Sequence, residues 1–314
     1  MEPAHPGARC ASRRALRKGF LPQRRRADSL RVEVREARPG DKAPLMSFIR
    51  DTWGGHDYIP YVWDAWMRDK DSKMFVVLAD GRPVGMNRVC FLEDGSAWLE
   101  GARVHPDYRG MGLATALAEE SMRLARRREV RVFRLTSGSR NYRAHRHIAR
   151  IGFKEISRIS VYVPSKIARP GPTRGVRHAG KDDEAAVTRM IRDSGEFRLG
   201  SGVMWDAFKA VALIEDTIDR ALAAGEVYTM GKAVAITKPS GERNERWRQV
   251  CFVAGEGAGA LQLIRHVFGR KEEFRTTWRL VYLPEGSHLI KVLREAGMVR
   301  HHSYILFERR AANG

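Results

Sequence analysis

Hydrophobic and polar positions change period several times between residues 31 and 163. Alternating or continuous apolar runs predict strands at 31–37, 73–79, 83–93, 96–104 and 130–136. A period of 3.6 residues predicts helices at 42–53, 60–69, 110–128 and 140–151, and residues 153–163 are expected to form a pair of strands. Asp80-Gly81 and Asp94-Gly95 are typical of hairpin turns. A strand meander followed by strands that alternate with helices predicts a mixed α/β sheet flanked by helices.

The same outline occurs twice in the chain. Val34-Arg35-x-Ala37 recurs as Val176-Arg177-x-Ala179, and Asp41 recurs as Asp183, at a constant offset of 142 residues. Ile49-Arg50-Asp51 recurs as Ile191-Arg192-Asp193 at the same offset. A constant spacing over 18 positions indicates an internal repeat. The prediction is therefore two tandem domains, at 31–165 and 176–314, joined by a Pro- and Gly-rich linker at 166–175 and preceded by an arm at 1–30.

Composition excludes several classes of protein. The chain has 314 residues, of which 43% are hydrophobic and 30% charged, so it has enough apolar residues for packed cores. No run of about 18 apolar residues occurs, and an integral membrane protein is not expected. Cys10, Cys90 and Cys251 are few and far apart, which argues against a disulfide framework or a zinc site and favours a reducing, cytoplasmic compartment.

The net charge of +20 is partly local. Residues 1–31 carry nine Arg or Lys side chains against only Glu2 and Asp28, and Pro and Gly interrupt any apolar period there. These features predict a disordered basic arm. The alternatives are an organelle transit peptide and a nucleic-acid-binding tail. Pro and Gly would break the helix that a transit peptide forms. A nucleic-acid-binding tail would need aromatic residues interleaved among the basic ones, and Phe20 is the only one.

Candidate chemistry centres on the segment from Val104 to Ala114, VHPDYRGMGLA, which joins a predicted strand to a predicted amphipathic helix. Gly110 and Gly112 allow the backbone amides to turn toward one point, and Arg109 adds positive charge. Unpaired N–H groups and the helix dipole favour a phosphate at a helix N-terminus. The segment lacks the Gly-Lys-Ser/Thr of a P-loop and the third glycine of a dinucleotide fingerprint. An ordinary tight strand–helix turn is the alternative.

Arg109-x-x-Gly112-x-Ala114, following a strand that ends at Val104, resembles the acetyl-CoA pyrophosphate loop of the GNAT acyltransferase superfamily. Asn141-x-x-Ala144, with Gly152-Phe153 after the helix, resembles that superfamily's second cofactor-contacting helix. The resemblance covers residues 31–163. It implies two GNAT-like domains in tandem, acetyl-CoA as co-substrate, no metal, and direct attack of an amine on the thioester. The implied cofactor-binding residues are Ala102, Arg103, Val104, Arg109, Gly110, Met111, Gly112, Leu113, Ala114 and Asn141.

Glu100, on the cofactor-bearing strand, is the candidate general base, because a carboxylate there can take the proton of the amine. The alternative is an ion-paired strand carboxylate, with Arg103 as its partner. The superfamily often has a tyrosine seven residues after the asparagine as the acid for the leaving thiolate, whereas this chain has Ile148. A thiolate of pKa about 8.5 leaves without an acid, so acyl transfer is still expected. Asn141 is also a candidate helix N-cap.

A narrower resemblance, to vertebrate histidine N-acetyltransferases and their bacterial relatives, rests on Gly54-Gly55-x-Asp57-Tyr58-Ile59-Pro60, Trp66, residues 99–104 and Arg134-Leu135-Thr136. It implies a small amine acceptor, above all a free amino acid. Tyr58 and Asp57 are the candidate acceptor-binding residues, with Arg134 or Arg103 as the partner of an acceptor carboxylate. Trp63 and Trp66, three residues apart on a predicted helix, are expected in the core.

Residues 176–310 repeat the outline but not the loop. Gly255-Glu256-Gly257-Ala258-Gly259-Ala260 lacks the arginine, and Glu256 would repel a phosphate. The second domain is therefore expected to be a degenerate copy that packs against the first and completes the acceptor site, with a second active site as the alternative. Competing functions are a protein N-terminal or lysine acetyltransferase, a non-catalytic CoA-binding protein, and a basic module associated with nucleic acid. Neither a membrane nor nucleic acid is the expected partner.

Overall fold

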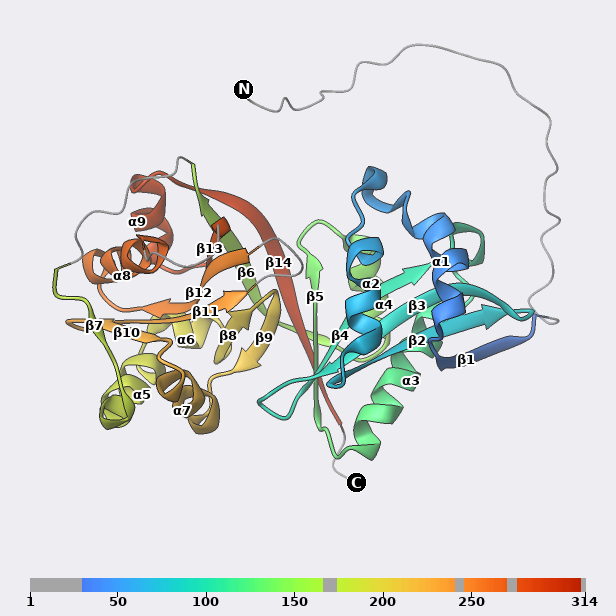
Figure 1. Ribbon diagram of the computed structural model, residues 1–314, viewed down its shortest axis with the longest axis horizontal. Coiled ribbons are helices and arrows are strands. Elements are labelled where there is room, and N and C mark those ends of the chain that lie inside the picture. The colour runs from blue at the N-terminus through green and yellow to red at the C-terminus, as the bar shows by residue number, and fades with distance from the viewer. Residues whose placement is uncertain (1–29, 166–173, 241–245, 270–275, 312–314) are drawn as a thin grey trace, which may run out of the picture.

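The computed structural model describes residues 30–165, 174–240, 246–269 and 276–311. The predicted basic arm, Cys10 and most of the predicted linker lie outside these residues. One sheet of 12 strands runs through the molecule, with helices on both faces (Figure 1). The fold class predicted from the sequence, a mixed α/β sheet flanked by helices, is confirmed.

The first half follows the predicted order of elements. Its strands are β1 Val32–Glu36, β2 Ser72–Ala79, β3 Arg82–Phe91, β4 Ala97–Val104, β5 Val132–Gly138 and β6 Lys154–Pro164. Its helices are α1 Lys42–Ile49, α2 Ile59–Arg68, α3 Leu113–Arg127 and α4 Tyr142–Arg150, with 3-10 turns at Pro39–Asp41, Thr52–Gly55 and Pro106–Tyr108. The strand pair expected at 153–163 was wrong: the segment is the single strand β6.

The second half repeats this order with one addition. Its strands are β7 Arg177–His178, β8 Val203–Asp206, β9 Lys209–Ala212, β10 Val227–Met230, β11 Ala233–Ser240, β12 Arg246–Ala254, β13 Thr276–Pro284 and β14 Met298–Arg310. Its helices are α5 Glu184–Arg192, α6 Gly195–Leu199, α7 Glu215–Ala223, α8 Gly257–Gly269 and α9 Leu289–Glu295, with a 3-10 turn at Lys181–Asp183. The addition is the β8–β9 hairpin, which pairs only with itself.

The sheet order is β1-β2-β3-β4-β5-β14-β6-β13-β12-β11-β10-β7. Read inward from either edge, each half contributes five strands in the same sequence of pairings, including one parallel pair, β4–β5 or β12–β13. At the centre the two halves exchange their last strands. β14 pairs with β5 of the first half, β6 pairs with β13 of the second half, and β6 and β14 pair with each other (Figure 1).

A local contact repeats along with the strand order. In the first half Arg35 donates to the Asp41 carboxylate at 2.8 Å, and the amide of Arg38 donates to the same carboxylate at 2.7 Å. In the second half Arg177 donates to Asp183 at 2.7 Å, and the amide of Gly180 donates to it at 3.0 Å. The residues that recur in the sequence therefore make the same contacts, tying the first strand of each half to the helix that follows it.

Each face of the sheet carries its own core. The strand residues that alternate along β2 illustrate the division: Phe75 and Val77 pack with α3 and α4, whereas Val76 and Leu78 pack with α1 and α2. Trp63 and Trp66 are buried in the second of these clusters, as the sequence predicts. The cluster under α3 and α4 also includes Ile305 and Phe307 of β14. The first half therefore buries side chains that arrive from the far end of the chain.

The substitution Phe307→Ala tests this dependence. Phe307 is 4% exposed in the core of the first half, so removing its ring is expected to lower the free energy of unfolding by about 3–5 kcal/mol. Val299 lies on the same strand and is 48% exposed, so Val299→Ala serves as the control and is expected to change it by less than about 0.5 kcal/mol. Urea unfolding followed by circular dichroism measures both, and equal effects would contradict the assignment.

Candidate active site

Strand β4 is distorted at its centre. Met86 pairs with Arg103 and Arg88 with Glu100, so two residues of β4, Gly101 and Ala102, lie opposite one residue of β3. This is a β-bulge, a feature that bends a strand and redirects its side chains and amides. Gly101 has a φ of +68°, and a Cβ there would lie 2.9 Å from the Trp66 ring. Only glycine fits both the backbone and the space.

Strands β4 and β5 separate next to the bulge at Gly101 and Ala102. They are paired in parallel only at Ala97 with Phe133 and at Trp98 with Arg134. Beyond Trp98 no ladder pair joins them, although β4 continues to Val104 and β5 to Gly138. Backbone groups on the β5 side of β4 therefore remain without a strand partner, and an extended ligand can pair with them.

The predicted phosphate loop lies at the end of β4 and at the start of α3. Gly110 and Gly112 have φ values of +87° and +79°, and a Cβ on either would meet no atom within 4 Å. Arg109 is exposed and donates from Nε to the carbonyl of Val104 at 3.2 Å, whereas Leu113 anchors the first turn of α3 in the core. The turn is open to solvent at the N-terminus of a 15-residue helix, where unpaired amides and the helix dipole attract an anion.

The glycines of the corresponding turn in the second half lie against neighbouring parts of the chain. A Cβ on Gly255 would lie 2.4 Å from the carbonyl oxygen of Lys232, and one on Gly257 would lie 2.7 Å from the Val292 side chain on α9. Glu256 adds a negative charge where Arg109 adds a positive one in the first half. The surroundings of these two glycines therefore differ from those of Gly110 and Gly112.

Glu100 lies at the edge of the bulge and is held by a cation. Its Oε1 accepts from Arg88 at 2.7 Å and from the Cys90 thiol at 3.2 Å. Arg88 is 3% exposed, and its guanidinium lies over the Trp66 ring. It also forms an ion pair with Asp69 and donates a hydrogen bond to Ser72. Burial, and then the Glu100 carboxylate, raise the pKa of Cys90, so the thiol stays neutral. The partner expected for Glu100 was Arg103, and the structure shows Arg88 instead.

Arg88 and Cys90 were not among the residues predicted for the site. Both lie on β3, in the run Arg82–Phe91, whose apolar character indicates a buried strand. A charged residue inside such a run requires a buried partner, and that requirement is the sequence signal that points to Arg88. The identity of the partner depends on the cross-strand register, which the bulge alters.

Asp57 and Arg103, both predicted site residues, bind each other. Arg103 donates to the two oxygens of Asp57 at 2.6 and 3.2 Å, and Asp57 also accepts from the amide of Ile59 at 3.0 Å. The Asp57 side chain is fully buried. This pair fastens the start of α2 to β4, and it leaves the ring of Tyr58, which is 45% exposed, beside Trp66 and the Arg103 guanidinium.

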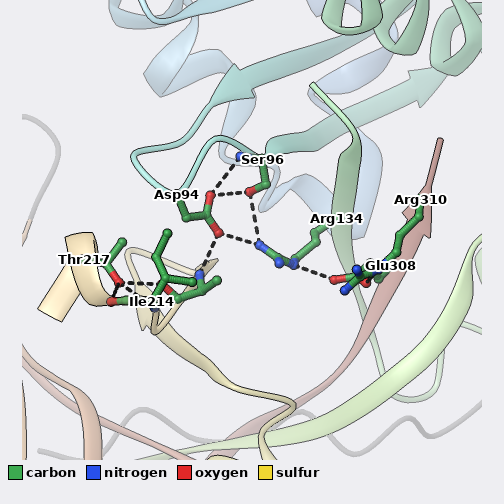
Figure 2. Close-up of polar contacts among 8 residues, drawn as sticks. Asp94, Ser96, Arg134, Ile214, Thr217, Glu308 and Arg310 are labelled. Carbon is green, nitrogen blue, oxygen red and sulfur yellow. Dashed lines mark hydrogen bonds and ion pairs between the residues drawn. The ribbon is translucent and has the colours of Figure 1, made fainter. Parts of the chain in front are cut away.

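Arg134, the third residue predicted to bind the acceptor, lies among buried carboxylates (Figure 2). It donates to Asp94 at 2.6 Å, to Glu308 at 2.9 Å and to Ser96 at 3.1 Å. Burial favours protonation of Asp94, but hydrogen bonds from Ser96 and from the amide of Ala212, together with the charge of Arg134, lower its pKa below the usual value. Arg134 therefore joins the two halves, and its guanidinium is already neutralised.

The remaining predicted residues lie on α4. The Asn141 side chain caps this helix, accepting from the amide of Ala144 at 3.3 Å. Ile148, which stands where a catalytic tyrosine was expected from the resemblance, is buried in the core under α3. Tyr142 is 66% exposed at the first turn.

The described residues contain no group of three or more His, Cys, Asp or Glu side chains arranged to hold a metal. None of the described helices has the length and apolar character needed to cross a membrane.

Comparison with known proteins agrees with this geometry. Residues 42–153 match the acetyltransferase (GNAT) family. Histidine N-acetyltransferase of Oreochromis niloticus is 32% identical over 115 residues, or 34% of each chain, and that of Xenopus tropicalis is 35% identical over 95 residues, or 29% of each. The match thus spans about a third of the length of these curated relatives. A GCN5-related N-acetyltransferase from Sphaerobacter thermophilus is 18% identical, with a TM-score of 0.57, and the match covers 89% of this chain and 95% of that one. This chain has the same fold.

The bulge is tested by Gly101→Ala. The added methyl group must adopt a positive φ and meets the Trp66 ring, so we expect a loss of about 1–3 kcal/mol in the free energy of unfolding. Gly40→Ala is the matched control, since its φ is ordinary and a Cβ there has nothing within 4 Å. Thermal unfolding of the two variants compares them, and a Gly101→Ala variant as stable as the control would show that the bulge is not constrained.

Proposed function

We propose that the protein is an acetyl-CoA-dependent N-acetyltransferase whose acceptor is a free amino acid, and the premise is the match of residues 42–153 to the acetyltransferase (GNAT) family. The observation that carries the proposal is the open turn at Gly110 and Gly112, directly beside the point where β4 and β5 separate. A diphosphate fits the turn, and an extended pantetheine arm fits along the unpaired edge of β4.

We further propose that residues 31–165 are the catalytic domain and residues 176–314 a degenerate copy. Amides from Arg109 to Ala114 would hold the diphosphate, with the Arg109 side chain adding charge. The backbone of Ala102 to Val104 would pair with the pantetheine arm. The bulge also supplies an N–H to the thioester oxygen, where negative charge develops during attack. The close surroundings of Gly255 and Gly257, together with the negative charge of Glu256, support the view that the second half binds no CoA.

Glu100 is proposed as the general base. The amine attacks the thioester carbonyl and forms the new C–N bond, Glu100 accepts the amine proton directly or through water, and the C–S bond breaks as thiolate leaves. Arg88 holds the carboxylate in one orientation, since Oε1 is fixed by two donors and Oε2 is free of any described partner. With Ile148 buried, no acid is assigned to the thiolate, which takes its proton from solvent.

A free amino acid is proposed as the acceptor because two matched relatives are histidine N-acetyltransferases. Tyr58 offers partly exposed aromatic surface against the buried Trp66 ring, which packs next to Gly101 of the bulge. The Asp57–Arg103 pair is proposed as support for this wall rather than as a direct acceptor contact, because each side chain satisfies the other. Thiol release from acetyl-CoA, measured with free amino acids, simple amines and peptides, identifies the class, and transfer to peptides alone would contradict it.

Charge reversal at the loop tests the cofactor site. Arg109→Glu is expected to weaken acetyl-CoA binding by about 10- to 100-fold, because a charge-assisted hydrogen bond contributes about 1.5–3 kcal/mol and the new carboxylate repels the phosphates. Isothermal titration calorimetry measures the Kd. Arg265→Glu, an exposed arginine on α8 of the second half, is the matched control and should leave the affinity unchanged. If only the Arg265→Glu control weakened acetyl-CoA binding, the result would contradict the proposed site and indicate that the second half binds the cofactor.

Replacement of Glu100 tests the proton transfer. Glu100→Gln keeps the side chain's size and its contact with Arg88 but cannot take a proton, so kcat is expected to fall about 100-fold or more. The Kd for acetyl-CoA should not change. Glu36→Gln is the control, since Glu36 is also a strand glutamate paired with a cation, Lys73. Stopped-flow and steady-state thiol release measure the rates, and an unchanged kcat would remove Glu100 from the chemistry.

A further inference from the structure

The exchanged strand β14 lies directly beside β5, the strand that separates from β4. Tyr304 of β14 pairs with Gly138, the last residue of β5, and the carbonyl of Ser303 accepts from the amide of Ser139 at 2.9 Å. The carbonyl of Gly138 accepts from the amide of Asn141, which the resemblance assigns to the cofactor, at 2.9 Å. Main-chain contacts therefore fix Tyr304, a residue of the second half, against the end of β5 that leads to Asn141.

Tyr304 also lies on the face of the sheet that carries Glu100. Successive side chains of a strand point to opposite faces. Tyr304 packs against the apolar cluster that contains Cys90 and Trp98, whereas Phe307 belongs to the cluster under α3 and α4. Glu100 lies two residues after Trp98 on β4, and its Oε1 is 3.2 Å from the Cys90 sulfur. The proposed base and the tyrosine of the second half therefore share one face.

The space on this face is open at Gly138. Side chains of directly paired residues lie side by side on one face, so a side chain on Gly138 would stand next to that of Tyr304. A Cβ on Gly138 would meet no atom within 4 Å. Gly138 is four residues beyond the Trp98–Arg134 pair, as Ala102 of the bulge is on β4, and the two strands no longer pair there. Open space therefore adjoins Tyr304 on the side of β4.

The Tyr304 side chain is held in place but its hydroxyl is free to bind a ligand. The side chain is half-buried, and its ring lies between those of Phe208, at the tip of the β8–β9 hairpin, and His302, with centroids 6.0 and 5.9 Å away. Burial raises the pKa of Tyr304, so the hydroxyl keeps its proton and can donate it to a hydrogen bond. No residue in the described part of the chain bonds to this hydroxyl. A partly desolvated donor without a partner favours a ligand that accepts.

The arginines of these strands are already paired with carboxylates. Arg88 binds Glu100 and Asp69. Arg103 binds both oxygens of Asp57, and Arg134 binds Asp94 and Glu308. Arg103 and Arg134, the two arginines that the sequence suggests as partners of an acceptor carboxylate, are therefore engaged elsewhere, and a neutral donor has to take that role.

We propose that Tyr304 forms the wall of the acceptor site opposite Glu100 and donates a hydrogen bond from its hydroxyl to the carboxylate of the acceptor. The inference rests on the proposed acetyl transfer to an amino acid. Neighbouring strands lie about 4.8 Å apart, so β4 and β14, with β5 between them, are about 10 Å apart. An amino acid in that span offers its amine to Glu100 and its carboxylate to Tyr304. The strand exchange thus makes the second half part of the site that selects the acceptor.

The test compares each accepted amino acid with its decarboxylated amine, which keeps the amine and the side chain but lacks the carboxylate. Tyr304→Phe removes only the hydroxyl, so KM for the amino acid is expected to rise about 10- to 100-fold, the effect of losing one hydrogen bond to a charged group. The kcat, KM for the amine and the Kd for acetyl-CoA should each change less than about twofold. Ser303→Ala is the control, because it removes a hydroxyl from the adjacent residue, which points to the other face and lies 3.0 Å from the Ser160 hydroxyl.

The outcomes separate the inference from the function on which it rests. A selective rise of KM for the amino acid in Tyr304→Phe, with Ser303→Ala unchanged, supports the inference. If the unsubstituted protein acetylates amino acids and Tyr304→Phe retains its KM, or raises KM for acid and amine equally, the inference is overturned and the transferase remains. A loss of acetyl-CoA affinity in Tyr304→Phe also overturns it, since the tyrosine would then serve the cofactor. A protein that acetylates nothing in the panel overturns both.

Discussion

The antiparallel pairing of β6 with β14 is the constraint on which the rest of the structure depends. Each is the last strand of its half, and each inserts beside the fifth strand of the other half. The exchange turns two sheets into one and places Ile305 and Phe307 in a core otherwise built from residues 75–153. Neither half can complete its core alone, so the pairing couples the folding of residues separated by 134 to 154 positions.

This coupling also explains why buried charge accumulates at the junction. Arg134 on β5 lies between Asp94 of the first half and Glu308 of the exchanged strand, and Asp94 also accepts from the hairpin of the second half (Figure 2). A buried ion pair contributes little net stability, because desolvation offsets its attraction, but breaking it is costly. Its effect is to fix the position of the hairpin relative to β4 and β5.

Local patterns in the sequence predicted most of the first half, because turn dipeptides, apolar periods and a glycine loop act over a few residues. The helices began and ended close to their predicted bounds, and the alternation of β2, β3 and β4 follows the apolar runs. The single strand at β6 was missed because its partner, β14, lies far along the chain. For the same reason the sequence did not predict the Arg88–Glu100 contact, which depends on the bulge, or the docking of the β8–β9 hairpin, which depends on how the two halves pack.

The two glycine turns have different surroundings in the two halves. Both precede a helix and both contain glycines, so the amides and the dipole at the start of α3 and α8 are similar. They differ in what surrounds them: Gly110 and Gly112 face solvent, whereas Gly255 and Gly257 meet Lys232 and Val292. An anion needs volume as well as donors, so the first turn suits an anion better than the second. The second half reaches β3 and β4 of the first half through its β8–β9 hairpin, which packs in the same apolar cluster as Cys90 and Trp98.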